Sequence, residues 1–125
     1  FSQVLHPALP GSPGHAHWQR LCASRPGDAG AGACTGAAAG LFSVIVDARF
    51  HSAQVDAFCD ALRLFKLGYS WGGPMSLVVP YDLAAMRPSW PSQVARGTLV
   101  RFSVGLEAVA DLRNDLLQAI QAALN

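Results

Sequence analysis

The chain has 125 residues, a formal net charge of +1, and 51% hydrophobic against 14% charged residues. This length is enough for one domain with a core and too short for two. The near-neutral charge excludes a strongly basic nucleic-acid binder, and the apolar content excludes a disordered tail. We therefore expect one domain over residues 1–125 that binds no nucleic acid.

The cysteines Cys22, Cys34 and Cys59 are odd in number and contain no close pair. This pattern argues against a disulfide framework and against a zinc ribbon, and it favours a reducing, cytoplasmic setting. The apolar runs 41–46 and 77–79 are far shorter than the roughly 20 residues that span a bilayer. No signal peptide opens the chain, so we expect no membrane association.

The first third of the chain is rich in turn and loop signals. Residues 3–13 hold three prolines and a Gly-Ser-Pro-Gly run, which predicts a short extended segment followed by a turn. A brief helical turn is expected over 17–22. Residues 24–40 are mainly Ala, Gly and small polar residues, which predicts a flexible loop. The apolar, β-branched run 41–46 predicts a buried central strand.

The middle of the chain has helical periodicity. Apolar residues recur at steps of three and four from Val55 to Phe65, which predicts an amphipathic helix over 52–67 with Ser52 as its N-cap and Gly68 just past its end. Lys66 would then lie near a helix C-terminus, where the helix dipole favours a cation. We do not assign this lysine to a Schiff base.

The last third predicts two strands and a helix. Residues 76–79 have strand propensity, 81–97 form a connecting loop, 99–105 alternate as a strand does, and 107–124 have helical spacing. The predicted fold is an α/β two-layer sandwich, with a small mixed or antiparallel sheet and helices mainly on one face.

Two short motifs are weighed and rejected. Gly68, Ser70 and Gly72 match the G-x-S-x-G of a nucleophile elbow, but Gly-Pro follows instead of a helix and no histidine comes later in the chain. His15 and His17 could offer imidazoles to a metal, but no fourth ligand follows at a suitable spacing. We expect neither a catalytic serine nor a metal site.

Arg101 is the strongest candidate binding residue. The alternation of its strand places Arg101 on the face opposite Val100, Phe102 and Val104. A guanidinium can hold a carboxylate by two parallel hydrogen bonds. An arginine that pairs with a local aspartate, or that is simply solvated, fits the residue pattern equally well.

Four tracts, residues 4–15, 40–43, 64–73 and 100–107, resemble in content and order the C-terminal domain of the cystathionine β-lyases. These enzymes are a branch of the Cys/Met-metabolism family, whose members have fold type I and use pyridoxal 5′-phosphate (PLP). Related γ-lyases and γ-synthases usually read Ser-Leu-Gly-Gly where this chain has Ser-Trp-Gly-Gly at 70–73, so Trp71 favours the β-lyase branch. The chain also begins at Phe1 without methionine, and we expect it to be a C-terminal piece of a longer enzyme.

The resemblance implies a role for a few residues. Arg101 would bind the α-carboxylate of an amino-acid substrate, cystathionine or another cysteine S-conjugate, with Tyr69, Ser70 and Trp71 lining the same pocket. The Schiff-base lysine and the phosphate-binding groups lie upstream in the family, so no catalytic or cofactor-binding residue is expected in this chain, and the chain alone should be inactive. The parent enzyme would be a cytoplasmic homo-tetramer of methionine biosynthesis that catalyses β-elimination.

The chain departs from the family in two places. Pro74-Met75 stand where the family usually has an aromatic residue and a glutamate, and the loop 24–40 is longer than the family's. Two alternatives stay open: a γ-lyase or γ-synthase, and a stand-alone module without catalysis that binds carboxylates or dimerises.

Overall fold

The computed structural model describes residues 1–22 and 38–124. Most of the expected loop 24–40, and Cys34 with it, lies outside these residues. The described elements, in chain order, are β1 (Gln3–Leu5), α1 (His15–Leu21), β2 (Leu41–Asp47), α2 (Ser52–Ala61), β3 (Lys66–Leu67), β4 (Leu77–Tyr81), α3 (Leu83–Met86), β5 (Gly97–Ser103) and α4 (Val109–Ala123).

The strands form one mixed sheet in the order β1-β2-β5-β4-β3. The pairs β1–β2, β2–β5 and β5–β4 are antiparallel, and only the edge pair β3–β4 is parallel. Strand β5 is therefore central, and its Arg101 lies opposite Ser43 of β2 and Val79 of β4. This mixed sheet with its helices confirms the predicted α/β class.

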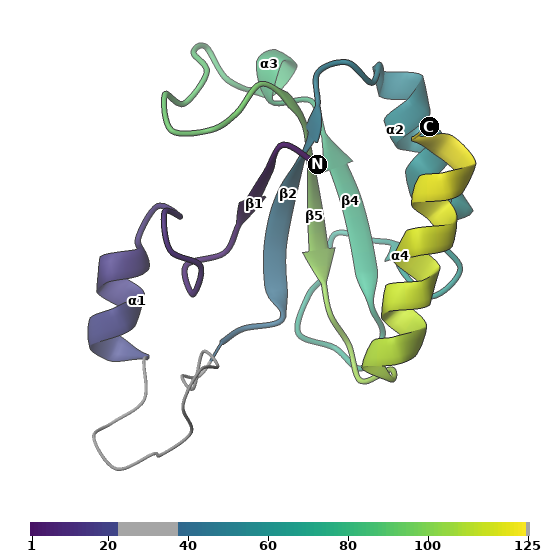
Figure 1. The fold of residues 1–125 in the computed structure, drawn as a ribbon, viewed down its shortest axis with the longest axis horizontal. Coiled ribbons are helices and arrows are strands. Elements are labelled where there is room, and N and C mark those ends of the chain that lie inside the picture. Colours follow the sequence, from purple (N-terminus) through teal and green to yellow (C-terminus); the bar gives the residue numbers. More distant parts are fainter. Residues whose placement is uncertain (23–37, 125) are drawn as a thin grey trace.

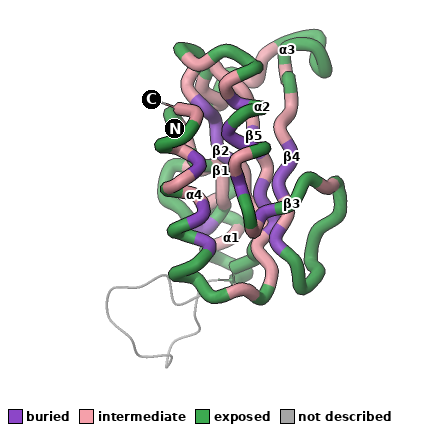
Figure 2. Tube along the Cα trace, turned by 90° about the vertical axis from the view of Figure 1, so that its right-hand side faces the viewer, coloured by how far each residue is buried: buried purple, intermediate pink, exposed green. Residues whose placement is uncertain are grey.

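Two helices cover one face of the sheet. Helices α2 and α4 lie side by side against it, whereas α1 lies past the β1 edge (Figure 1). The buried residues concentrate where the central strands meet these helices (Figure 2). The core residues include Val44, Val46, Val55, Phe58, Val78, Val100, Phe102, Leu112 and Ala119. No helix in the described residues is both long and apolar enough to cross a membrane.

Helix α2 ends earlier than its periodicity predicts, at Ala61 rather than at residue 67. Its first turn is closed by a capping box between His51 and Gln54, so the N-cap is His51 and not Ser52. At the other end, Leu62 is extended, with φ −67° and ψ 133°. Leu62 and Phe65 remain buried as predicted, but on an extended segment that leads into β3.

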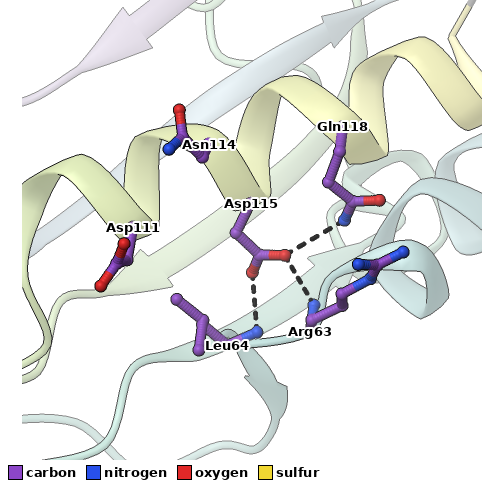
Figure 3. Close-up of a pocket in the computed structure, with 6 residues that line it drawn as sticks. All are labelled: Arg63, Leu64, Asp111, Asn114, Asp115 and Gln118. Carbon is purple, nitrogen blue, oxygen red and sulfur yellow. Dashed lines mark hydrogen bonds between the residues drawn. The ribbon is translucent and has the colours of Figure 1, made fainter.

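The carboxylate of Asp115 on α4 explains this early end. It accepts hydrogen bonds from the backbone amides of Arg63, Leu64 and Phe65 at 2.8, 2.8 and 3.3 Å. In a continued helix these amides would donate to carbonyls four residues earlier, so the carboxylate replaces those partners. Gln118 completes the cluster, because its Nε2 donates to Asp115 Oδ1 (Figure 3). The same Nε2 also donates to the carbonyl of Ala61.

The same hydrogen bonds control the charge of Asp115, which is only 5% exposed. Burial raises the pKa of this carboxyl, but the hydrogen bonds from the three amides and from Gln118 outweigh burial and lower the pKa below its usual value. Asp115 therefore stays charged as a structural tie between α4 and the segment that follows α2.

The early helix end also changes the setting of Lys66. The prediction that Lys66 lies at a helix C-terminus is wrong, because this residue pairs with Leu77 in strand β3. Its amide donates to the carbonyl of Ser76 at 3.0 Å. Two residues are too few to show the alternation by which a strand is read from sequence, so β3 was not predicted.

A second carboxylate fixes the end of the sheet where β4 begins and β5 ends. Glu107, just before α4, accepts hydrogen bonds from the amide and the hydroxyl of Ser76, both at 2.8 Å. These bonds lower the pKa of Glu107. The Ser76 hydroxyl in turn accepts a bond from the Gly105 amide at 2.9 Å. The start of β4 and the exit from β5 are thereby held together.

Replacing Asp115 by asparagine should lower the free energy of unfolding by about 2–4 kcal/mol, because the variant loses a charged acceptor and turns an amide NH₂ toward backbone donors. Asp111→Asn, at an exposed position on the same face of the helix one turn earlier, is the matched control and should cost less than about 1 kcal/mol. Urea unfolding followed by circular dichroism measures both. Equal losses would remove Asp115 as the tie.

Acid should destabilise the fold through the same carboxylates. The pKa values of Asp115 and Glu107 are lower in the folded than in the unfolded chain, so their contribution is complete above the unfolded values and is lost as pH falls toward the folded ones. Unfolding free energies measured between about pH 6 and pH 3 should decline with falling pH. The decline should be shallower in Asp115→Asn, and an unchanged slope would contradict this account.

Candidate carboxylate-binding site

The face of the sheet that α2 and α4 leave uncovered carries the candidate site. Val100 and Phe102 point into the helix-covered core, so the alternation of β5 turns Arg101 to the other face. This is the orientation that the sequence predicts. Because Arg101 is in the middle of the central strand, the sheet holds its backbone on both sides.

The guanidinium of Arg101 lies against the segment that follows β3. Its Nη2 donates to the carbonyl oxygens of Gly68, Tyr69 and Ser70 at 3.3, 2.8 and 3.3 Å. Its Nε is buried and has no hydrogen-bond partner among the described residues. A buried donor without a partner carries a desolvation cost, so this group favours an added acceptor. The sequence also allowed a pairing of Arg101 with a local aspartate, but its acceptors among the described residues are main-chain carbonyls.

A cavity of about 250 Å³ opens beside Arg101. Its apolar and aromatic walls come from Tyr81, Leu83, Met86 and Leu99, and its polar groups come from Ser43, Arg87 and Arg101. The Tyr81 ring lies 5.9 Å from Arg101 Cζ. Mostly apolar walls with a few polar groups are typical of small-molecule sites.

The other three predicted pocket residues take different positions around Arg101. Tyr69 and Ser70 meet it through their main-chain oxygens. The Tyr69 ring packs edge-on against Tyr81, with 6.5 Å between ring centroids, and is 78% exposed. Trp71 is 64% exposed, and among the described contacts none joins its indole to Arg101. The structure thus brings Tyr69 and Ser70 to Arg101 but leaves Trp71 on the surface.

Sequence reasoning missed Ser43, Tyr81, Met86 and Arg87. Three of these lie in or beside the short helix α3, within the stretch that was predicted to be a featureless connection. The available signal was Asp82, whose carboxylate caps α3 by accepting bonds from the amides of Ala84 and Ala85 at 3.0 and 3.2 Å. Ser43 is one strand away from Arg101 and gave no signal of its own.

A larger cavity, of about 460 Å³, lies on the helix side of the sheet (Figure 3). It is lined by Arg63, Leu64, Asp111, Asn114, Asp115 and Gln118. Its one buried charge is Asp115, whose hydrogen bonds to the backbone already account for it. We therefore place the candidate site at the smaller cavity, beside Arg101.

Cofactor and metal chemistry find little support in the described residues. Lys66 is the sole lysine of the chain and is exposed on edge strand β3. His15 Nδ1 donates to the Pro7 carbonyl, 2.8 Å away, and His17 Nδ1 accepts from Arg20 Nη2 at 2.6 Å. Within the described ranges no group of three or more His, Cys, Asp or Glu residues could hold a metal ion.

The unusual Pro74-Met75 pair is integrated into the fold. The Pro74 carbonyl accepts a bond from the Leu106 amide at 2.9 Å, and Met75 is 53% exposed. A β-carbon on Gly105 would collide with the Pro74 carbonyl oxygen, so the two turns approach closely only because residue 105 is glycine. The departure therefore leaves the sheet intact and puts an apolar side chain on the surface.

Known proteins resemble the chain along most of its length. A family model described as "Cys/Met metabolism PLP-dependent enzyme" matches residues 1–121. The cystathionine beta-lyase of Salmonella typhimurium is 42% identical over 118 residues, which cover 92% of this chain and 26% of that protein. The cystathionine gamma-lyase of Sus scrofa is 34% identical over 128 residues, covering 97% and 27%.

A solved structure agrees with these sequence matches. The cystathionine gamma synthase from Xanthomonas oryzae pv. oryzae, in complex with cystathionine, has a TM-score of 0.69 and 29% identity, covering 98% of this chain and 29% of that one. The chain spans about a quarter of the length of the curated relatives it matches.

Removing the guanidinium should loosen the segment after β3. In Arg101→Met the three carbonyls at 68–70 lose their shared donor, so chymotrypsin should cut after the exposed Tyr69 or Trp71 about tenfold faster. Arg113→Met, an exposed arginine on α4, is the matched control and should leave the cleavage rate unchanged. Equal rates in both variants would show that Arg101 does not hold this segment.

Proposed function

Since the chain belongs to the Cys/Met metabolism PLP-dependent enzyme family, we propose that it is the C-terminal, carboxylate-binding part of a PLP-dependent carbon–sulfur lyase. The observation that carries this proposal is the arginine at the centre of the uncovered sheet face. Arg101 borders a cavity and keeps a buried Nε without a partner. A carboxylate bound in that cavity would lie beside the positive charge of this guanidinium.

The proposed reaction is β-elimination from cystathionine or a related cysteine S-conjugate. A proton leaves Cα, the Cβ–S bond breaks, and the sulfur departs as a thiol, homocysteine in the case of cystathionine. Water then hydrolyses the remaining three-carbon fragment to pyruvate and ammonia. PLP, when bound in the whole enzyme, supplies the electron sink for the charge that develops at Cα.

Arg101 would contribute orientation to this reaction. The attraction of the guanidinium for the α-carboxylate would orient this end of the substrate, which determines the direction in which the Cα–H bond points. Tyr69 and Ser70 hold the guanidinium from behind through their carbonyls. Tyr69, Ser70 and Trp71 are proposed to line the substrate pocket with it.

The cofactor itself would be held mainly by the rest of the enzyme. The chain's sole lysine, Lys66, is exposed, and its strand is at the sheet edge, so it does not fit a Schiff-base role. We therefore propose that the isolated chain neither binds PLP tightly nor turns over substrate. The parent enzyme is proposed to be a cytoplasmic homo-tetramer.

A β-lyase is preferred over the γ-type alternatives for two reasons. Identity to the Salmonella β-lyase is 42%, against 34% to the Sus scrofa γ-lyase. Trp71 also stands where γ-type enzymes usually have leucine. The two classes are distinguished by product, since β-elimination of cystathionine releases pyruvate and γ-elimination releases 2-oxobutyrate.

In the full-length enzyme, Arg101→Ala should lower kcat/KM for cystathionine by at least about tenfold and raise KM, because a carboxylate anchor is worth roughly 1.5–3 kcal/mol. Steady-state assays of pyruvate release measure this. Arg113→Ala, which removes an exposed arginine from α4, is the control for a change in net charge alone.

Two other outcomes would each contradict a different part of the proposal. Unchanged kinetics in Arg101→Ala would remove Arg101 from the substrate site while leaving the lyase assignment in place. Wild-type enzyme that releases no keto acid from any cysteine S-conjugate would instead support a non-catalytic module.

A further inference from the structure

The cavity beside Arg101 contains a second arginine that the proposed carboxylate anchor does not use. Arg87 follows helix α3 and lines the same cavity of about 250 Å³. Its side chain is exposed, and among the described residues its guanidinium has no hydrogen-bond or ion-pair partner. A solvated arginine on a convex surface would need no explanation, but Arg87 lines the same cavity as the cation Arg101.

The fold places Arg87 at this position. The α3 turn is short, but its N-terminus is capped by Asp82, and its last turn is closed by the Arg87 amide, which donates to the Leu83 carbonyl at 3.1 Å. Both Leu83 and Met86 face the cavity with Arg87. The Asp82 carboxylate accepts bonds from two amides of α3 and is not among the residues that line the cavity.

The charge of the cavity is unbalanced. Its lining residues include two guanidiniums and no carboxylate, and the remaining walls are Tyr81, Leu83, Met86, Leu99 and Ser43. Two cations at one cavity favour an occupant with negative charge at two points. A ligand with one carboxylate would satisfy Arg101 and leave Arg87 without a partner.

We infer that Arg87 binds a second carboxylate, at the far end of the sulfur substituent, so the site selects thioether amino acids that carry two carboxylates. This inference rests on the proposed function for the identity of the first carboxylate. It makes Arg87 a specificity-determining residue that acts on the leaving group and not on the reacting carbons. Substrates with an uncharged S-alkyl group would be used less efficiently.

The test compares two cysteine S-conjugates in the full-length holoenzyme. S-(2-carboxyethyl)-L-cysteine carries the distal carboxylate, and S-propyl-L-cysteine lacks it, while both release pyruvate on β-elimination. The ratio of their kcat/KM values should favour the carboxyethyl compound, and Arg87→Gln should lower that ratio by about tenfold or more. Arg96→Gln, on the same β4–β5 connection but stacked on Trp90 and outside the cavity lining, should leave the ratio unchanged.

A binding measurement separates this inference from the proposed function. Pimelate and heptanoate have the same chain length but two and one carboxylates, and calorimetric titration should show tighter binding of pimelate that disappears in Arg87→Gln. If the wild type released no pyruvate but still preferred pimelate in an Arg87-dependent way, the assignment as a lyase would be wrong. The binding site for two carboxylates would still be supported. A different result would overturn the role of Arg87. In that result the wild type releases pyruvate, and Arg87→Gln changes neither the ratio of kcat/KM values nor the preference for pimelate.

Discussion

The carboxylate of Asp115 accepts hydrogen bonds from three consecutive backbone amides, and the path of the segment that contacts Arg101 follows from this one buried contact. By taking the amides of residues 63–65, it ends α2 and turns the chain into β3. The pairing of β3 with β4 then carries the carbonyls of residues 68–70 to the guanidinium of Arg101. A charge on the helix-covered side thus helps to place the carbonyls that accept hydrogen bonds from Arg101.

The two faces of the sheet divide structural and chemical roles between them. One face is closed by α2 and α4, and its polar groups are engaged by the backbone. The other face holds the cationic cavity. Strand β5 serves both faces, because Val100 and Phe102 anchor it in the core while Arg101, between them, points outward.

The helix-covered core and the face that carries Arg101 could be predicted because they depend on periodicity, which a single sequence displays. The end of α2 could not be predicted, because the apolar residues from Val55 to Phe65 keep helical spacing. The helix ends early because Asp115, about fifty residues later, takes the backbone amides that would continue it. Likewise Arg101 was found from its place in an alternating strand, whereas Ser43 and Arg87 reach the cavity only through the tertiary fold. The family resemblance drew attention to Trp71, yet in this chain alone its indole remains exposed.

The sheet has its longest strands in the middle and its shortest at the borders. Strands β2 and β5 have seven residues each, whereas the outer strands β1 and β3 have three and two. A border this short offers few free amides and carbonyls to a neighbouring molecule, and Lys66 adds a charge to the β3 side. Two molecules of the chain can therefore form few hydrogen bonds between their edge strands. This disfavours fibrous aggregation at the high concentrations that crystallisation or NMR requires.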